Sequence, residues 1–199
     1  NSDPSSVNAG VDKSIPIDTP FRLAASAVDV GDTLSYQWDQ MDAGTVATDS
    51  TTLGTDQGTN PLFRSYAPSN ISTRDFPALV NQLNATTTLG ETLPTTPRDL
   101  NFRVTVRDGR TGQGTDDIAV TVDPTSGPFK LTSHGTEETF AATDVTIVTW
   151  DSANTEAWPL SCGNVDIKLY TFSADESTYG ITNLLLSTPN IGTATVSIP

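Results

Sequence analysis

Apolar side chains recur at every second position in several short stretches of the chain. This period of two is the pattern of β-strands with one buried face. The clearest stretches are 21–27, 34–38, 100–106 and 118–122. A first edge strand is expected over 11–17, because Pro16 has no N–H to donate to a central ladder. Five strands of this kind predict an antiparallel β-sandwich.

The turn at 29–32 reads Asp-Val-Gly-Asp, a composition that favours a tight reversal. It predicts that 21–27 and 33–39 form a β-hairpin. The segment 42–99 then interrupts the strand pattern, and it is too long for an ordinary loop. We expect it to be a structured insertion in the first sandwich.

Three parts of this insertion differ in pattern. Residues 44–60 are rich in Thr, Gly and Asp and predict irregular structure. Residues 62–66 predict a short strand. Residues 75–83 predict a short helix, with Asp75 as its N-cap, Pro77 in its first turn and its apolar residues on one face.

A linker is expected at 124–128, where Pro, Ser and Gly cluster. The alternating pattern then resumes in five shorter stretches. These are 129–132, 145–150, 165–172, 182–186 and 193–198. The predicted fold is therefore all-β, with two tandem Ig-like sandwiches over 1–123 and 129–199.

The charge balance excludes several classes of function. The 199 residues include 24 acidic and 10 basic side chains, a formal net charge of −14. A polyanion of this kind is repelled by nucleic acids and by anionic lipid surfaces. No apolar run approaches the roughly 20 residues that span a bilayer. Few lysines with abundant Thr, Ser, Asp and Gly are typical of secreted bacterial modules, and we read the chain as a piece of a longer polypeptide.

A single His and a single Cys limit the catalytic chemistry further. They cannot build a Cys/His zinc site or a disulfide within the chain. A Ser-His-Asp triad would need His134, and a Cys-His pair would need Cys162 with His134. We interpret His134 as a surface turn residue and Cys162 as a small, half-buried apolar residue.

Two sets of motifs resemble known families. Residues Ala25–Gln40, with an acidic turn followed by Tyr36 and Trp38, resemble the B–C hairpin of PKD-like and cadherin-like Ig-fold modules. A longer series of short motifs extends through the chain. It comprises Phe63–Tyr66, Phe76-Pro77, Gly90–Thr96, Arg98–Arg103, Val106–Asp108, Gly127–Phe129, Val148–Asp151, Cys162, Val165–Ile167 and Pro189–Gly192. This series resembles the region after the protease domain in secreted bacterial reprolysin-like zinc metallopeptidases.

The resemblance implies a non-catalytic module, because the zinc-binding His-Glu-x-x-His helix of those peptidases is absent from this sequence. It implies a monomeric accessory region, secreted or held at the cell surface, that binds a protein substrate or a cell-surface glycan. The alternative is an adhesin-type or carbohydrate-binding module of a large surface protein. An independent hydrolase using two of the many carboxylates is a third hypothesis, without a specific motif.

Calcium is the cofactor that the PKD-like resemblance implies. By position, its ligands would be Asn8, Asp29, Asp32 and Asp108, with Asp117, Asp116 or Asp12 as additions. The turn at 29–32 is one residue shorter than in that family. The alternative is that these residues only form turns, which Asp and Gly favour without a metal.

Trp158 is the candidate for contact with a ligand. It stands beside Pro159 in a predicted loop, whereas Trp38 and Trp150 fall on predicted strands. An indole in a loop can stack on a sugar or a peptide. Packing within the fold is the alternative for this residue.

Overall fold

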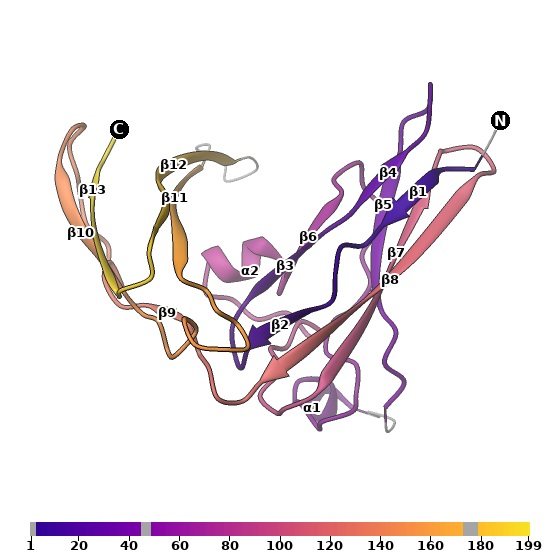
Figure 1. Cartoon of the computed structure of the whole chain (residues 1–199), viewed down its shortest axis with the longest axis horizontal. Coiled ribbons are helices and arrows are strands. Elements are labelled where there is room, and N and C mark those ends of the chain that lie inside the picture. Colours follow the sequence, from indigo (N-terminus) through magenta and orange to yellow (C-terminus); the bar gives the residue numbers. More distant parts are fainter. Residues whose placement is uncertain (1–2, 45–48, 173–178) are drawn as a thin grey trace. The chain divides into compact units, whose positions relative to one another are not determined.

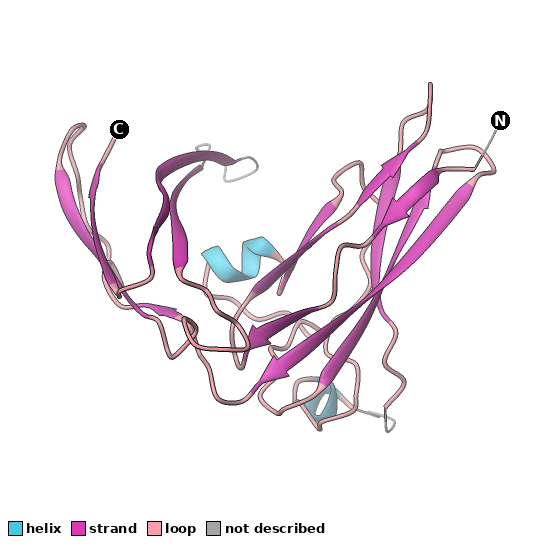
Figure 2. Cartoon of the chain, viewed as in Figure 1, coloured by secondary structure: helices cyan, strands magenta, loops and turns pink. Residues whose placement is uncertain are grey.

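The computed structural model describes residues 3–44, 49–172 and 179–199. In this part of the chain the structure is mostly β-strand, with only two short helices (Figures 1 and 2). The chain divides into two compact units, Asn1–Pro124 and Thr125–Pro199. The protein is therefore all-β, as the alternating pattern predicts. No helix among the described residues is long and apolar enough to cross a membrane.

The main sheet of the first unit has the strand order β2-β8-β7-β5. Its central hairpin joins β7 (Asp99–Arg107) to β8 (Gln113–Asp123), and β5 (Ser35–Gln40) lies antiparallel to β7. The alternation read from the sequence is visible here, because Leu100 and every second residue to Val106 are buried.

Strand β2 (Lys13–Pro16) occupies the edge of this sheet, as Pro16 predicts. The expectation of purely antiparallel pairing is wrong for β2, which runs parallel to β8. The two strands are about a hundred residues apart in the chain, so no tight turn forces them to be antiparallel.

The predicted hairpin of 21–27 with 33–39 is also wrong. The first stretch splits into β3 (Phe21–Ala24) and β4 (Ser26–Val28), which have different partners. Strand β3 pairs with β6 (Thr73–Phe76), and β4 pairs with β1 (Ser5–Asn8). The split falls at Ala25, whose N–H donates to the carbonyl of Ser72 at 3.1 Å.

The insertion contains β6 and two helices, α1 (Ser50–Leu53) and α2 (Leu79–Leu83). Helix α2 is shorter than the predicted 75–83, because Asp75 belongs to β6 and pairs with Arg22. The N-cap position is held by Ala78, which offers no side-chain cap. The predicted strand over 62–66 is absent, and Phe63 makes only an isolated bridge with Glu91.

Four phenylalanines join the insertion to the sheets of the first unit. Phe63 and Phe76 come from the insertion, and they pack against Phe21 and Phe102 with ring centroids 4.7–6.1 Å apart. Phe76 and Phe102 are fully buried. The insertion is therefore part of the core.

A buried ion pair fixes a second point of the insertion. The Asp56 carboxylate accepts five hydrogen bonds, one of them from Arg98 at 2.8 Å. The side chains of Asp56 and Arg98 are 0 % and 3 % exposed. Burial alone would raise the pKa of Asp56, but the hydrogen bonds from Gly58, Thr96 and Arg98 together lower it below its ordinary value.

The second unit holds a three-stranded sheet and a two-stranded hairpin. The sheet has the order β13-β10-β9, formed by Thr193–Ser197, Val145–Asp151 and Lys130–Leu131. The hairpin joins β11 (Asn164–Phe172) to β12 (Tyr179–Pro189). Each of these strands overlaps one of the five stretches that alternate in the sequence, and β12 extends beyond its stretch of 182–186 at both ends.

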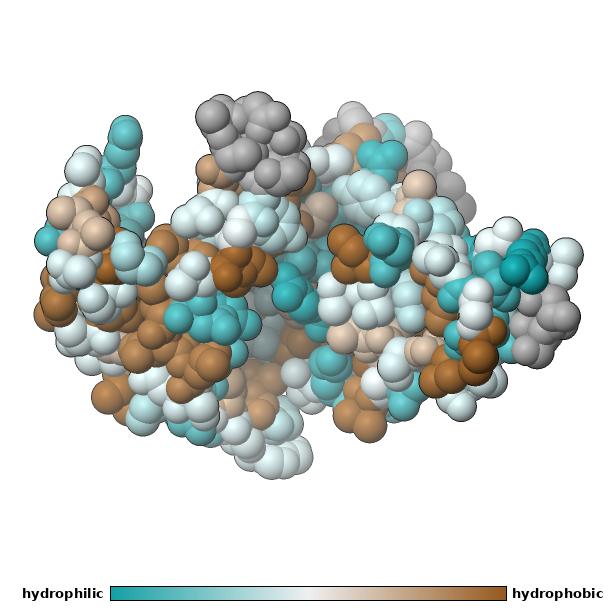
Figure 3. Space-filling view, turned by 90° about the horizontal axis from the view of Figure 1, so that it is seen from above, coloured by the Kyte–Doolittle hydropathy of each residue, from teal (hydrophilic) through white to brown (hydrophobic). Residues whose placement is uncertain are grey.

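The core of the second unit is small. Among the described residues of this unit, the buried apolar ones are Val148, Trp150 and Val196, with partly buried neighbours around them. Other large apolar side chains of the chain stay exposed, and Figure 3 shows hydrophobic patches among hydrophilic residues on the surface. Among the described residues of this unit, Trp158 is the most exposed large hydrophobic side chain.

Candidate functional site

Three carboxylates from two turns meet at one end of the first unit. Asp29 and Asp32 lie in the turn between β4 and β5, and Asp108 follows the end of β7. One carboxylate oxygen of each residue lies within 4.8 Å of the others. Of the residues expected to bind calcium, the structure thus brings together Asp29, Asp32 and Asp108.

Asp108 is held in a fixed orientation by its own turn. It is buried, and its Oδ1 accepts hydrogen bonds from the N–H groups of Arg110 (2.8 Å) and Gly112 (3.1 Å). Both the Oδ2 of Asp108 and the Oδ1 of Asp3 lie close to Gly112. A Cβ atom added to Gly112 would lie only 2.6 Å from the first oxygen and 3.0 Å from the second. Asp3 therefore lies near Asp108, although no sequence motif indicates it.

Asp29 and Asp32 differ in the partners of their carboxylates. The Oδ2 atom of Asp29 is shielded from solvent and has no hydrogen-bond partner among the residues that the structure describes. Asp32 forms an ion pair with Arg110 at 2.9 Å. The three carboxylates and this guanidinium together carry a formal charge of −2. Arg110 is a member of the site that the sequence reasoning missed.

The other expected ligands have partners of their own. The Oδ1 of Asn8 accepts the N–H of Gly10 at 2.7 Å, closing a local turn. Asp117 forms a two-pronged ion pair with Arg103, with both contacts at 2.7 Å. Asp116 accepts the N–H of Ala9 and Asp12 that of Ala119, each at 2.8 Å. Successive residues of a strand point to opposite faces, so Asp116 and Asp117 face different neighbours.

Trp158 is 85 % exposed, on a braced loop of the second unit. The buried side chain of Asn190 donates to Thr155 Oγ1 (3.0 Å) and to the carbonyl of Cys162 (2.9 Å). It also accepts the indole N–H of Trp150 at 2.7 Å. These bonds tie the two ends of the loop that carries Trp158, at Thr155 and Cys162, to the core.

The single His and the single Cys have local contacts. The Nδ1 of His134 lies 3.1 Å from Glu138, and its ring contacts Phe140 edge-on. The thiol of Cys162 donates to the carbonyl of Asn164 at 3.3 Å. Cys162 is exposed, which contradicts the expectation that it is half-buried.

Comparison with known proteins gives little. No protein-family model matches the chain, and no curated protein matches it. One similar solved structure is SGBP-B from the mixed-linkage glucan utilization locus of Bacteroides ovatus, in complex with a mixed-linkage heptasaccharide. The identity is 11 % and the TM-score is 0.27, with coverage of 100 % of this chain and 48 % of that chain. The chain thus spans about half the length of that structure.

Proposed function

We propose that this chain is a non-catalytic β-module of an extracellular bacterial protein, stabilised by calcium at the end of its first unit. The observation behind the calcium is the meeting of Asp29, Asp32 and Asp108 around a shielded oxygen without a partner. A hard divalent cation takes carboxylate oxygens as ligands.

The geometry of the three carboxylates suits such an ion. Calcium binds oxygens at about 2.3–2.6 Å, so two ligands on opposite sides of one ion lie about 4.6–5.2 Å apart. The three oxygens lie within 4.8 Å of one another, so none is too far from the others to bind the same ion. The formal charge of −2 equals that needed to balance one divalent ion.

A turn without metal explains only part of this arrangement. It accounts for Asp108, whose Oδ1 already accepts two backbone N–H groups. It does not account for Asp29, because a shielded acceptor without a partner costs about 1–3 kcal/mol. A bound cation would remove that cost, which favours the metal.

The site should bind calcium weakly. Arg110 neutralises one carboxylate, and few protein oxygens remain for a shell of six to eight. Sites in extracellular modules have dissociation constants of about 10⁻⁴–10⁻³ M. At a tenfold excess over such a constant, calcium would stabilise the folded chain by about 1.4 kcal/mol.

Thermal unfolding of the whole chain tests the metal. With millimolar calcium the melting temperature should rise by roughly 3–6 °C over its value with a chelator. Asp29→Asn should abolish the rise, whereas Asp117→Asn, a matched change outside the site, should retain it. Equal melting temperatures in calcium and chelator would overturn the calcium proposal.

As the parent protein, we propose a secreted metallopeptidase in which this chain is an accessory region. Its support is the ordered series of sequence motifs, and the local contacts of His134 and Cys162 are consistent with a region that has no catalytic role. The purified chain should not hydrolyse casein. The sequence of the parent gene tests the assignment, since a His-Glu-x-x-His motif upstream is expected and tandem copies of this module would contradict it.

An adhesin-type or carbohydrate-binding module is the second candidate, favoured by the exposed Trp158 on its braced loop. Exposed aromatic anchors held in a fixed position are typical of binding surfaces. This candidate predicts glycan binding that Trp158→Ala abolishes. Ile191→Ala, another exposed apolar position of the same unit, is the matched control.

A further inference from the structure

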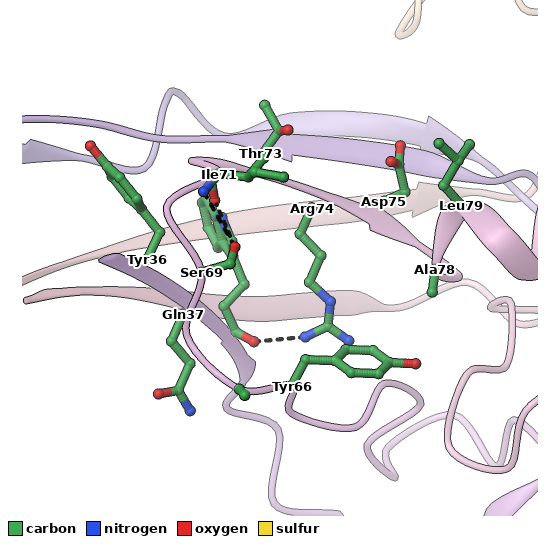
Figure 4. A pocket seen from close by; sticks show the side chains of 12 residues that line it. Tyr36, Gln37, Tyr66, Ser69, Ile71, Thr73, Arg74, Asp75, Ala78 and Leu79 are labelled. Atoms are coloured by element: carbon green, nitrogen blue, oxygen red, sulfur yellow. Dashed lines mark hydrogen bonds between the residues drawn. The ribbon is translucent and has the colours of Figure 1, made fainter. Parts of the chain in front are cut away.

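The insertion and the outer edge of β5 form a cavity that is partly open to solvent. The cavity has a volume of about 290 Å³, and its wall is formed by β5, the segment 66–71, β6 and the start of α2. Figure 4 shows Arg74 crossing the middle of this wall, with Tyr36, Ser69 and Thr73 to one side of it. Its size is near the lower end of the range for small-molecule sites, about 300–1,000 Å³.

The walls of the cavity are tied together. Tyr36 and Ser69 exchange two backbone hydrogen bonds, at 2.7 and 3.1 Å. The indole of Trp38 donates to the carbonyl of Ser72 at 3.1 Å, and Arg74 donates to the carbonyl of Trp38 at 2.7 Å. The cavity is therefore formed before any ligand arrives, which lowers the entropic cost of binding.

The charged residues of the wall are already neutralised by partners. Arg74 forms an ion pair at 2.9 Å with Glu91, whose side chain is completely buried. Asp75 pairs with Arg22 through two hydrogen bonds of 2.7 and 3.0 Å. An ion would gain little from either residue, so the wall favours a neutral ligand.

The remaining groups are hydroxyls and aromatic rings. The hydroxyls of Tyr36, Tyr66 and Thr73 make no hydrogen bond with any residue that the structure describes. Burial, and next the charge of Glu91, raise the pKa of Tyr66, so its hydroxyl remains a donor at neutral pH. The Arg74 guanidinium lies 4.8 Å from the centre of the Tyr66 ring, yet Tyr66 is still 41 % exposed.

We propose that this cavity binds the end of a neutral saccharide chain, with Tyr66 as the stacking residue and the hydroxyls of Tyr36 and Thr73 as hydrogen-bonding groups. A sugar offers both an apolar C–H face and many hydroxyls, and therefore matches the aromatic and the polar parts of the wall. The inference goes beyond the proposed function, because it places a glycan site in the first unit, apart from Trp158, and it is independent of calcium.

Affinity electrophoresis of the whole chain tests the proposal. The probes are soluble β-glucan, xylan, galactomannan and starch in the gel, and calorimetry then uses oligosaccharides of the polymer that retards the chain. At least one polymer should retard it, and Tyr66→Ala should weaken binding by about tenfold or more. Thr73→Val removes one hydroxyl at nearly constant shape, so it tests the cavity even if Tyr66→Ala fails to fold.

The controls separate this site from the others. Trp158→Ala should bind like the wild type, and a chelator should leave glycan binding intact whether or not it changes the melting temperature. Retardation by none of the four polymers overturns the proposal. It is equally overturned if Tyr66→Ala and Thr73→Val bind normally, or if Trp158→Ala alone abolishes binding. Competition by peptides and not by oligosaccharides would assign the cavity to a peptide.

Discussion

Asp56 is the residue whose charge matters most to the first unit. Its carboxylate is completely buried and neutralises Arg98, which is also buried. We expect Asp56→Asn to lower the free energy of unfolding by about 3–5 kcal/mol, because it leaves an unpaired guanidinium in the interior. Urea unfolding followed by circular dichroism measures this change.

Asp117→Asn is the matched control for that substitution. Asp117 also forms a two-pronged contact with an arginine, but this pair lies at the surface. Exposed ion pairs are screened by water and contribute little. A loss of stability in Asp117→Asn equal to that in Asp56→Asn would contradict the role of burial.

The lowered pKa of Asp56 predicts a pH dependence. The unfolded chain has the ordinary value of about 3.9, so the folded state keeps Asp56 ionised to lower pH than the unfolded state does. The contribution of ionised Asp56 to the free energy of unfolding is complete above about pH 5. It disappears as the pH falls through the pKa of Asp56 in the folded state. The stability difference between wild type and Asp56→Asn should therefore shrink below about pH 4. A constant difference from pH 6 to pH 3 would contradict this assignment.

The positions of single residues in the candidate site were predictable from the sequence where those residues lie in turns. Asp29, Asp32 and Asp108 lie in acidic turns, and turns between neighbouring strands gather at the ends of a fold. Arg110 and Asp3 could not be found in this way. Their position depends on the path of the turn after β7 and of the N-terminal segment, which no local pattern specifies.

At the scale of elements, the insertion is a structural part of the first unit. Phe76→Ala should lower the free energy of unfolding by about 3–5 kcal/mol, as expected for truncating a fully buried ring. It should also speed amide hydrogen exchange in β7 and β8, where Phe102 contacts this ring. Mass spectrometry of the exchanging peptides measures the effect.

Leu89→Ala is the control within the same insertion, because Leu89 is largely exposed. It should change the stability by less than about 0.5 kcal/mol. If Phe76→Ala were equally mild, the insertion would be an appendage outside the core.

The alternating pattern predicted the positions of the strands along the chain much better than it predicted which strands pair. The pattern of 100–106 and 118–122 placed β7 and β8, and their short connection made them a hairpin. The stretch 21–27 has the same pattern, yet its two halves pair with β6 and β1. Period-two alternation specifies which face of a strand is buried, and it carries no information about the strand alongside.

For the whole molecule, the excess of acidic residues determines solubility. The net charge of −14 keeps copies apart at neutral pH, and the sequence isoelectric point is about 4.1. We expect a minimum of solubility near pH 4, where the repulsion disappears and the exposed apolar side chains can associate. Turbidity from pH 3 to pH 7 measures it, and clear solutions throughout would contradict the expectation.

The parallel pairing of β2 with β8 has a consequence for the order in which the chain folds. Ala9 and Asp116, which are hydrogen-bonded beside this pair, are 107 residues apart. Closing a loop of that length costs about 4 kcal/mol of chain entropy, and the contacts that compensate for it form only once the strand is in place. During synthesis from the N-terminus, β2 has no neighbour until β8 has been made and paired with β7. The strand that is made early in the chain is therefore expected to join its sheet last.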